Sequence, residues 1–179
     1  MTDEEPPWFF RYVDDASDDV ARKLGHDPPI RPAVAIRLSA ERPTTRVVAL
    51  VDSGSERTLA APGLARAIGV DLRNAPEVEI GIGGSVRKIR VAEVTLQMYA
   101  DILDDDAPAL DEWRADVGFF NEWSPPWAMV LGRRGFFERY TVTMHGGIPA
   151  LVVDSYDTFD QQYGVRLAGW EPKQPRFRP

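Results

Sequence analysis

The segment with the clearest chemical potential is Ala49-Leu50-Val51-Asp52-Ser53-Gly54-Ser55, in which an apolar run ends in an aspartate and a tight Ser-Gly turn. A carboxylate at the end of a buried strand loses hydration, which is unfavourable unless its charge is used or hydrogen-bonded. Asp52 can therefore act as a catalytic acid or base, or it can cap the turn that follows it. These residues alone support both interpretations equally.

Two further segments bear on this choice. Gly81-Ile82-Gly83-Gly84 lies about thirty residues downstream, between two stretches with the alternating pattern of strands. Glycines in that position are typical of a hairpin tip. Met129-Val130-Leu131-Gly132-Arg133 follows about eighty residues after Asp52 and places an apolar pair before a glycine.

With these three segments in this order, the chain resembles the retropepsin-like aspartic proteases over about Ala33 to Val153. The resemblance implies a mainly β fold, a closed acid-protease barrel with one or two short helices. It also implies a homodimer that acts on peptides or proteins, with one catalytic aspartate from each chain. At the other apolar-Asp-Ser sequence, Asp154-Ser155-Tyr156, a tyrosine replaces the glycine, so the second carboxylate is expected from Asp52 of a second copy.

The resemblance also implies a role for each residue of the catalytic loop. Two Asp52 carboxylates would share one proton, activate a water and protonate the scissile carbonyl, and this chemistry requires no metal or cofactor. Ser53 would lock the two loops across the dimer axis, and Gly54 would let the substrate approach the backbone. Many members of the family have alanine where this chain has Ser55, and here a second hydroxyl near the carboxylates is expected to favour their ionised form.

Outside the loop, the resemblance makes Gly81, Ile82, Gly83 and Gly84 a mobile flap over the substrate. Leu131 and Gly132 would pack beneath the catalytic loop. Glu56 and Arg133 are expected to form an ion pair that braces the loop, the alternative being two solvated surface charges.

The remaining pattern favours short strands at about 33–38, 46–51, 78–80, 86–98, 127–131, 140–144 and 150–153, and one short helix within 59–68. Residues 101–126 are expected to form an acidic loop with one strand at Ala115–Phe120, and Arg133–Arg139 one or two helical turns. We divide the chain into an acidic N-terminal extension (1–32), a retropepsin-like domain (33–153) and a C-terminal tail (154–179).

Composition excludes several function classes. The chain has 179 residues, a net charge of −7 and no cysteine, which argues against nucleic acid as the main partner and against disulfides or thiolate metal sites. The longest apolar runs are five residues, far below the roughly 20 needed to span a bilayer. The first residues lack the pattern of a signal peptide, so the expected location is the cytoplasm.

Two other functions remain open at this point. One is a non-catalytic module with a retropepsin fold that mediates dimerisation or binds peptides. The other is an all-β interaction domain in which the motif match is accidental. The intact Asp52-Ser53-Gly54 sequence favours the peptidase, because a binding module has no need to keep a buried carboxylate.

Overall fold

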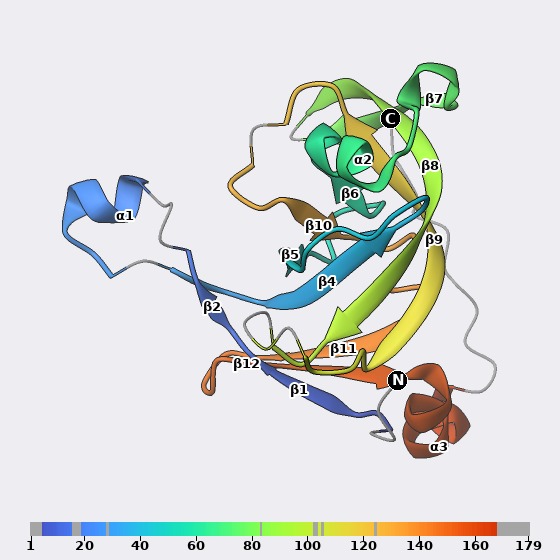
Figure 1. Cartoon of the computed structure of the whole chain (residues 1–179). Coiled ribbons are helices and arrows are strands. Elements are labelled where there is room, and N and C mark those ends of the chain that lie inside the picture. Colours follow the sequence, from blue (N-terminus) through green and yellow to red (C-terminus); the bar gives the residue numbers. More distant parts are fainter. Residues whose placement is uncertain are drawn as a thin grey trace, which may run out of the picture.

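The computed structural model describes residues 5–15, 19–27, 29–82, 84–101, 104, 106–123 and 125–167. Strands are the commonest regular structure in this part of the chain (Figure 1). The strands are β1 (Trp8–Arg11), β2 (Val13–Asp14), β3 (Ile30–Arg31), β4 (Ala33–Ser39), β5 (Val47–Val51), β6 (Leu59–Ala60), β7 (Glu77–Ile82), β8 (Ser85–Tyr99), β9 (Asp111–Phe120), β10 (Met129–Leu131), β11 (Tyr140–His145) and β12 (Ala150–Ser155). The helical elements are α1 (Asp19–Leu24), α2 (Pro62–Ile68), η1 (Leu72–Asn74, a 3-10 turn) and α3 (Tyr156–Leu167).

Six strands form a closed barrel. They follow one another in the order β4-β5-β10-β6-β9-β8, and a further pairing of β8 with β4 closes the ring. The interior is filled by side chains that the strands turn inward, among them Ile36, Leu96, Val117 and Met129, which are fully buried. Strand β7 pairs with β8 outside this ring and forms a hairpin with it. The predicted mainly β, closed-barrel fold is therefore confirmed.

A second sheet, of three strands, packs on the barrel in the order β1-β12-β11. β1 brings the N-terminal segment against the last strand, where Trp8 lies opposite Val153. Trp8 and Phe10 point into the core, whereas Phe9 between them is 73% exposed. This alternation is what a half-buried strand requires.

An aromatic cluster joins this sheet to the barrel. The ring of Tyr140 lies 6.1 Å from Trp8, 5.3 Å from Trp113 and 5.1 Å from Phe136, measured between centroids. The Tyr140 hydroxyl donates a 2.6 Å hydrogen bond to Asp111. Burial, followed by this contact with the Asp111 carboxylate, raises the pKa of Tyr140 well above its ordinary value of 10.0.

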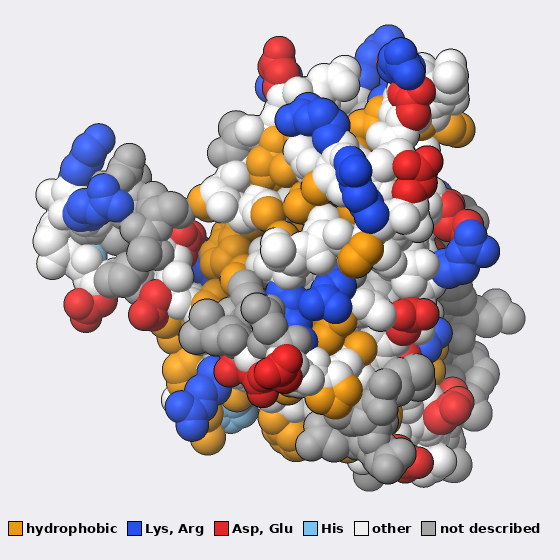
Figure 2. All heavy atoms as spheres, in the orientation of Figure 1, with side chains coloured by type: hydrophobic (Ala, Val, Ile, Leu, Met, Phe, Trp, Pro, Cys, Tyr) orange, Lys and Arg blue, Asp and Glu red, His pale blue; other side chains and the backbone are white. Residues whose placement is uncertain are grey.

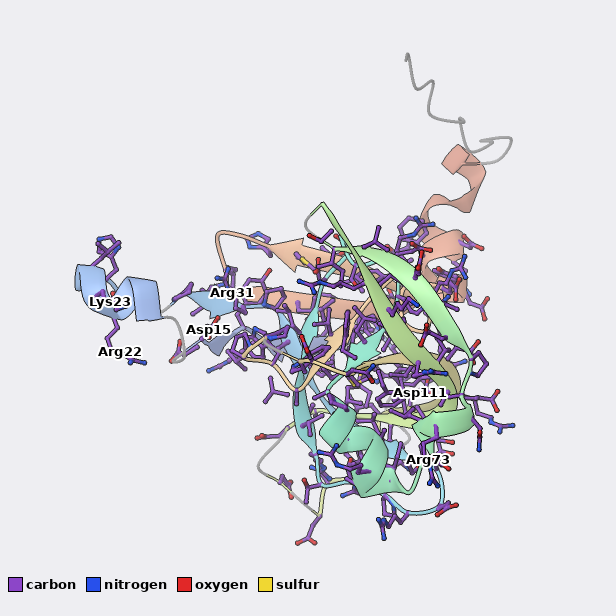
Figure 3. The ribbon with its side chains drawn as sticks, turned by 90° about the horizontal axis from the view of Figure 1, so that it is seen from above. Asp15, Arg22, Lys23, Arg31, Arg73 and Asp111 are labelled. Atoms are coloured by element: carbon purple, nitrogen blue, oxygen red, sulfur yellow. The ribbon has the colours of Figure 1, made fainter. Side chains whose placement is uncertain are left out.

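Strands β2 and β3 and helix α1 extend from one side of the body (Figure 1). At their base Arg31 lies 3.6 Å from Asp15, and Figure 3 shows both side chains beside the body while Arg22 and Lys23 lie farther out on α1. Side chains of both charges are spread over the face of the barrel shown in Figure 2. Across the described part of the chain, none of the helices has the length and apolarity to cross a membrane.

The structure corrects several predicted elements. The predicted helix within 59–68 begins only at Pro62, since Leu59 and Ala60 form β6 between β9 and β10. Strand β9 starts at Asp111 and is longer than the predicted strand at 115–120. Residues 133–139 form turns instead of a helix, because Gly135 takes φ 90°, which no helical residue adopts. The segment after Ser155, predicted to be a tail, begins with the helix α3.

Candidate active site

Asp52 lies where two parallel strands of the barrel end together. In β5 and β10, Ala49 is aligned with Met129 and Val51 with Leu131. The backbone N–H of Asp52 then donates to the Leu131 carbonyl at 3.0 Å. The aspartate is thus the first residue beyond the buried strand, held to the neighbouring strand by its own backbone.

The Asp52 carboxylate organises the turn that follows. Its Oδ1 accepts a 2.9 Å hydrogen bond from the N–H of Gly54, and its carbonyl accepts one of 3.1 Å from the N–H of Ser55. This is an Asx turn. Ser53 and Gly54 are exposed and Asp52 is half-buried. The turn therefore uses one carboxylate oxygen, and the carboxylate remains within reach of solvent.

Gly132 fits beneath this loop because it has no side chain. A Cβ on Gly132 would lie 2.4 Å from the Arg57 carbonyl oxygen and 2.8 Å from that of Ser55. Real Cβ atoms essentially never come within 3.0 Å of another heavy atom. Gly132 therefore lies against the backbone of Ser55 and Arg57.

Four hydrogen bonds tie the loop to the segment after β10. Arg133 N–H donates to the Ser55 carbonyl at 2.9 Å, and Arg134 N–H to the Glu56 carbonyl at 3.0 Å. In the opposite direction, the Thr58 N–H donates to the Arg134 carbonyl at 2.9 Å. The hydroxyl of Thr58, which is fully buried, accepts from the Gly132 N–H at 3.2 Å. Two segments far apart in the sequence thus form one support for Asp52.

Two predicted side-chain contacts differ in the structure. The Ser55 hydroxyl donates to the Arg57 carbonyl at 2.8 Å, so its proton stabilises the loop backbone and is not donated to the Asp52 carboxylate. Glu56 lies 3.8 Å from Arg134, one residue beyond its predicted partner Arg133. Because both side chains of this pair are more than half exposed, the contact contributes little to stability.

The predicted flap is the β7–β8 hairpin. Ile82 pairs with Ser85 at its end, and Gly84 adopts φ 79°, a left-handed conformation that favours glycine. Gly81 has open space around its Cα. Gly83 lies outside the described residues.

Sequence reasoning missed two parts of this site. Thr58 was not identified, although its place six residues after Asp52, at the start of an apolar pair, could have suggested a buried hydroxyl. The wall formed by Phe120 and Trp123 was also missed. Their rings lie 5.7 Å apart and pack against a buried cluster of Leu59, Ile89 and Val130.

No group of three or more metal-ligating side chains occurs in the residues that the structure describes. The ionisable group that the turn presents at the end of β5 is the Asp52 carboxylate. Carboxylates of this kind act as general acids or bases, and a second one nearby is needed for a shared proton.

The chain is similar to solved structures of retropepsin-like proteases. A retropepsin-like aspartic protease from Rickettsia conorii is similar with a TM-score of 0.47 and 10% identity, over 86% of this chain and 94% of that chain. EIAV protease bound to an inhibitor has a TM-score of 0.34 and 16% identity, over 57% and 82% of the two chains. The retroviral protease-like domain of Ddi1 from Leishmania major has a TM-score of 0.38 and 13% identity, over 69% and 93%.

No protein-family model matches the sequence, and no curated protein matches it.

Proposed function

We propose that this chain is an aspartic peptidase whose active site forms when two copies of Asp52 meet in a homodimer. The observation that carries the proposal is the placement of Asp52. Its backbone is fixed at the end of two parallel strands, one carboxylate oxygen holds the turn, and the side chain stays half-exposed. Residues 33–153 carry this site.

A two-fold axis close to Asp52 would supply the second carboxylate. Homodimers with such an axis bring the same residue of both subunits together. Two carboxylates at close range cannot both ionise readily, so the pair keeps one proton. The ionised member takes a proton from a water, whose oxygen bonds to the carbonyl carbon, and the other member protonates the carbonyl oxygen. Collapse of the tetrahedral intermediate breaks the C–N bond: the member that took the proton from water gives it to the departing amine, and the other member recovers a proton from a hydroxyl of the intermediate.

The other loop residues have roles that follow from their positions. Ser53 is exposed at the tip of the turn, where its hydroxyl can contact the same turn of the second subunit. Gly54 is exposed too, and its lack of a side chain leaves the backbone open to an extended peptide. The β7–β8 hairpin would cover the bound peptide and exclude water.

The test is peptide cleavage by the Asp52→Asn variant. Asparagine keeps the volume of the side chain and can still accept from Gly54 N–H, but it removes the ionisable group. We expect loss of cleavage with an unchanged melting temperature. Asp154→Asn is the matched control, because Asp154 also comes directly after an apolar run, here within β12, and accepts a local hydrogen bond from Ser155 N–H at 2.8 Å. Equal cleavage by wild type and Asp52→Asn would contradict the proposal, and peptide binding without cleavage by the wild type would favour a binding module.

A further inference from the structure

The two faces of the β7–β8 hairpin differ in chemistry. Directly paired residues of antiparallel strands lie on the same face, and here Val78 is paired with Ile89 and Ile80 with Arg87. Ile89 is buried, and Val78 and Ile80 pack with it against apolar residues of β6 and β10. This is the inner face of the hairpin, turned towards the barrel strands that lead to the catalytic loop. Arg87 therefore lies on the inner face.

The other basic residues of the hairpin lie on its outer face and are paired with an acid there. Glu77 lies 2.9 Å from Lys88 and 2.9 Å from Arg90. The hydrogen bond from Lys88 lowers the pKa of the Glu77 carboxyl. Within the part of the chain that the structure describes, Arg87 makes neither an ion pair nor a side-chain hydrogen bond. One exposed guanidinium is thus left on the inner face.

The inner face adjoins an aromatic wall. Phe120 is paired with Ile89 across β8 and β9, and its ring contacts that of Trp123. The indole N–H of Trp123 donates to the Trp127 carbonyl at 2.6 Å, which fixes the loop after β9.

We propose that Arg87 selects peptides that carry an acidic side chain next to an apolar one. The inference rests on the proposed function, since it requires a peptide between the hairpin and Asp52. Such a peptide would place an apolar side chain against Ile80, Phe120 and Trp123. The nearest side chain on the same face of the extended peptide, two residues along, would meet the Arg87 guanidinium. A carboxylate forms stronger hydrogen bonds with a guanidinium than a neutral group does. The whole chain carries a net charge of −7, which repels acidic peptides in general. The preference for an acidic side chain therefore comes from the local charge of Arg87 and acts against that repulsion.

The experiment compares three sets of internally quenched peptides that share a central apolar pair and differ at one flanking position, which holds Glu, Gln or Lys. For the wild type we expect kcat/KM to fall from Glu to Gln to Lys, by roughly two- to fivefold per step, as one exposed ion pair provides. The Arg87→Gln variant should cleave all three equally, and Arg87→Glu should prefer Lys. The preference should weaken at high salt.

Lys88→Gln is the matched control, since it removes the same charge from the neighbouring residue on the outer face. It should keep the wild-type order. The same peptides, labelled with a fluorophore, are also bound to the Asp52→Asn protein and their affinities measured by anisotropy. That readout is independent of catalysis, so an absence of cleavage by the wild type counts against the proposed function alone. Equal affinities for the Glu and Lys peptides, or the same loss of preference in Arg87→Gln and Lys88→Gln, would overturn the role of Arg87.

Discussion

Replacing Gly132 by alanine tests whether the catalytic loop depends on close backbone packing. The added Cβ would lie 2.4 Å and 2.5 Å from the carbonyl oxygen and carbon of Arg57, and 2.8 Å from the Ser55 oxygen. Ordinary contact begins at 3.4 Å, so the two segments must separate by about 1 Å. All three neighbours are backbone atoms, and no rotation of a side chain can relieve the overlap.

The hydrogen bonds that this separation stretches give the expected loss in the free energy of unfolding. The bonds from Arg133 to Ser55 and from Arg134 to Glu56 measure 2.9 and 3.0 Å, and a 1 Å increase takes both beyond hydrogen-bonding distance. Two lost bonds cost about 2 kcal/mol in the free energy of unfolding, and overpacking adds about 1–3 kcal/mol. We expect a total loss of about 3–5 kcal/mol, together with loss of cleavage as Asp52 moves.

Urea unfolding followed by tryptophan fluorescence measures this loss, with Gly81→Ala and Gly118→Ala as graded controls. At Gly81 a Cβ meets nothing within 4 Å, so its variant should stay within about 0.5 kcal/mol of the wild type. At Gly118 the nearest atoms are the side-chain ends of Ile89 and Leu59, at 2.5 and 2.9 Å, which can move, so the loss should be about 1–2 kcal/mol. A Gly132→Ala protein as stable as Gly81→Ala would refute the reasoning.

Three further outcomes follow from the contacts described above. Ser55→Ala removes the hydrogen bond to the Arg57 carbonyl and should lower the free energy of unfolding by about 1 kcal/mol while leaving the pH profile of cleavage in place; a shift of that profile would show that the hydroxyl does reach the carboxylates. Because the pKa of Tyr140 is raised in the folded state, stability should be complete below pH 10 and decline as the pH rises above it, and Tyr140→Phe, which also loses the bond to Asp111, should flatten that decline in melting curves. Specific activity should fall on dilution, since each site needs Asp52 from two chains, and a constant value far below the dimer dissociation constant, measured by sedimentation, would contradict the homodimer.

The sequence could predict the strands around Asp52 because their pattern is local. Ala33–Ser39 alternates, Val47–Val51 is continuously apolar, and both are strands of the barrel. Strand β9 was underestimated, although Trp113, Ala115 and Val117 alternate with charged residues over its first half. The alternation in β9 was not recognised because the segment before the strand is acidic. Charged residues on the outer face of a strand lower its mean hydropathy but do not change the alternation of apolar and polar residues.

Other elements depend on contacts that a local pattern does not contain. Strand β6 has two residues, and it exists because β9 and β10 pair with it on either side. The turns after β10 replace the predicted helix because Gly135 takes a positive φ, and the Gly135 carbonyl accepts from the indole N–H of Trp113, a residue of β9. The helix α3, by contrast, had a local signal, since the Ser155 hydroxyl accepts from Thr158 N–H as an N-cap does.

The ion pair of Glu56 shows why side-chain partners are harder to predict than backbone positions. The resemblance placed a basic residue directly after Gly132, and both Arg133 and Arg134 donate backbone hydrogen bonds to the catalytic loop. The guanidinium that approaches Glu56 is that of Arg134, at 3.8 Å. The backbone hydrogen bonds fix the position of Asp52 whichever arginine forms the ion pair. The loop that begins at Asp52 and the segment that begins at Gly132 therefore form a single structural unit. Their spacing in the sequence predicts the site better than any one side chain does.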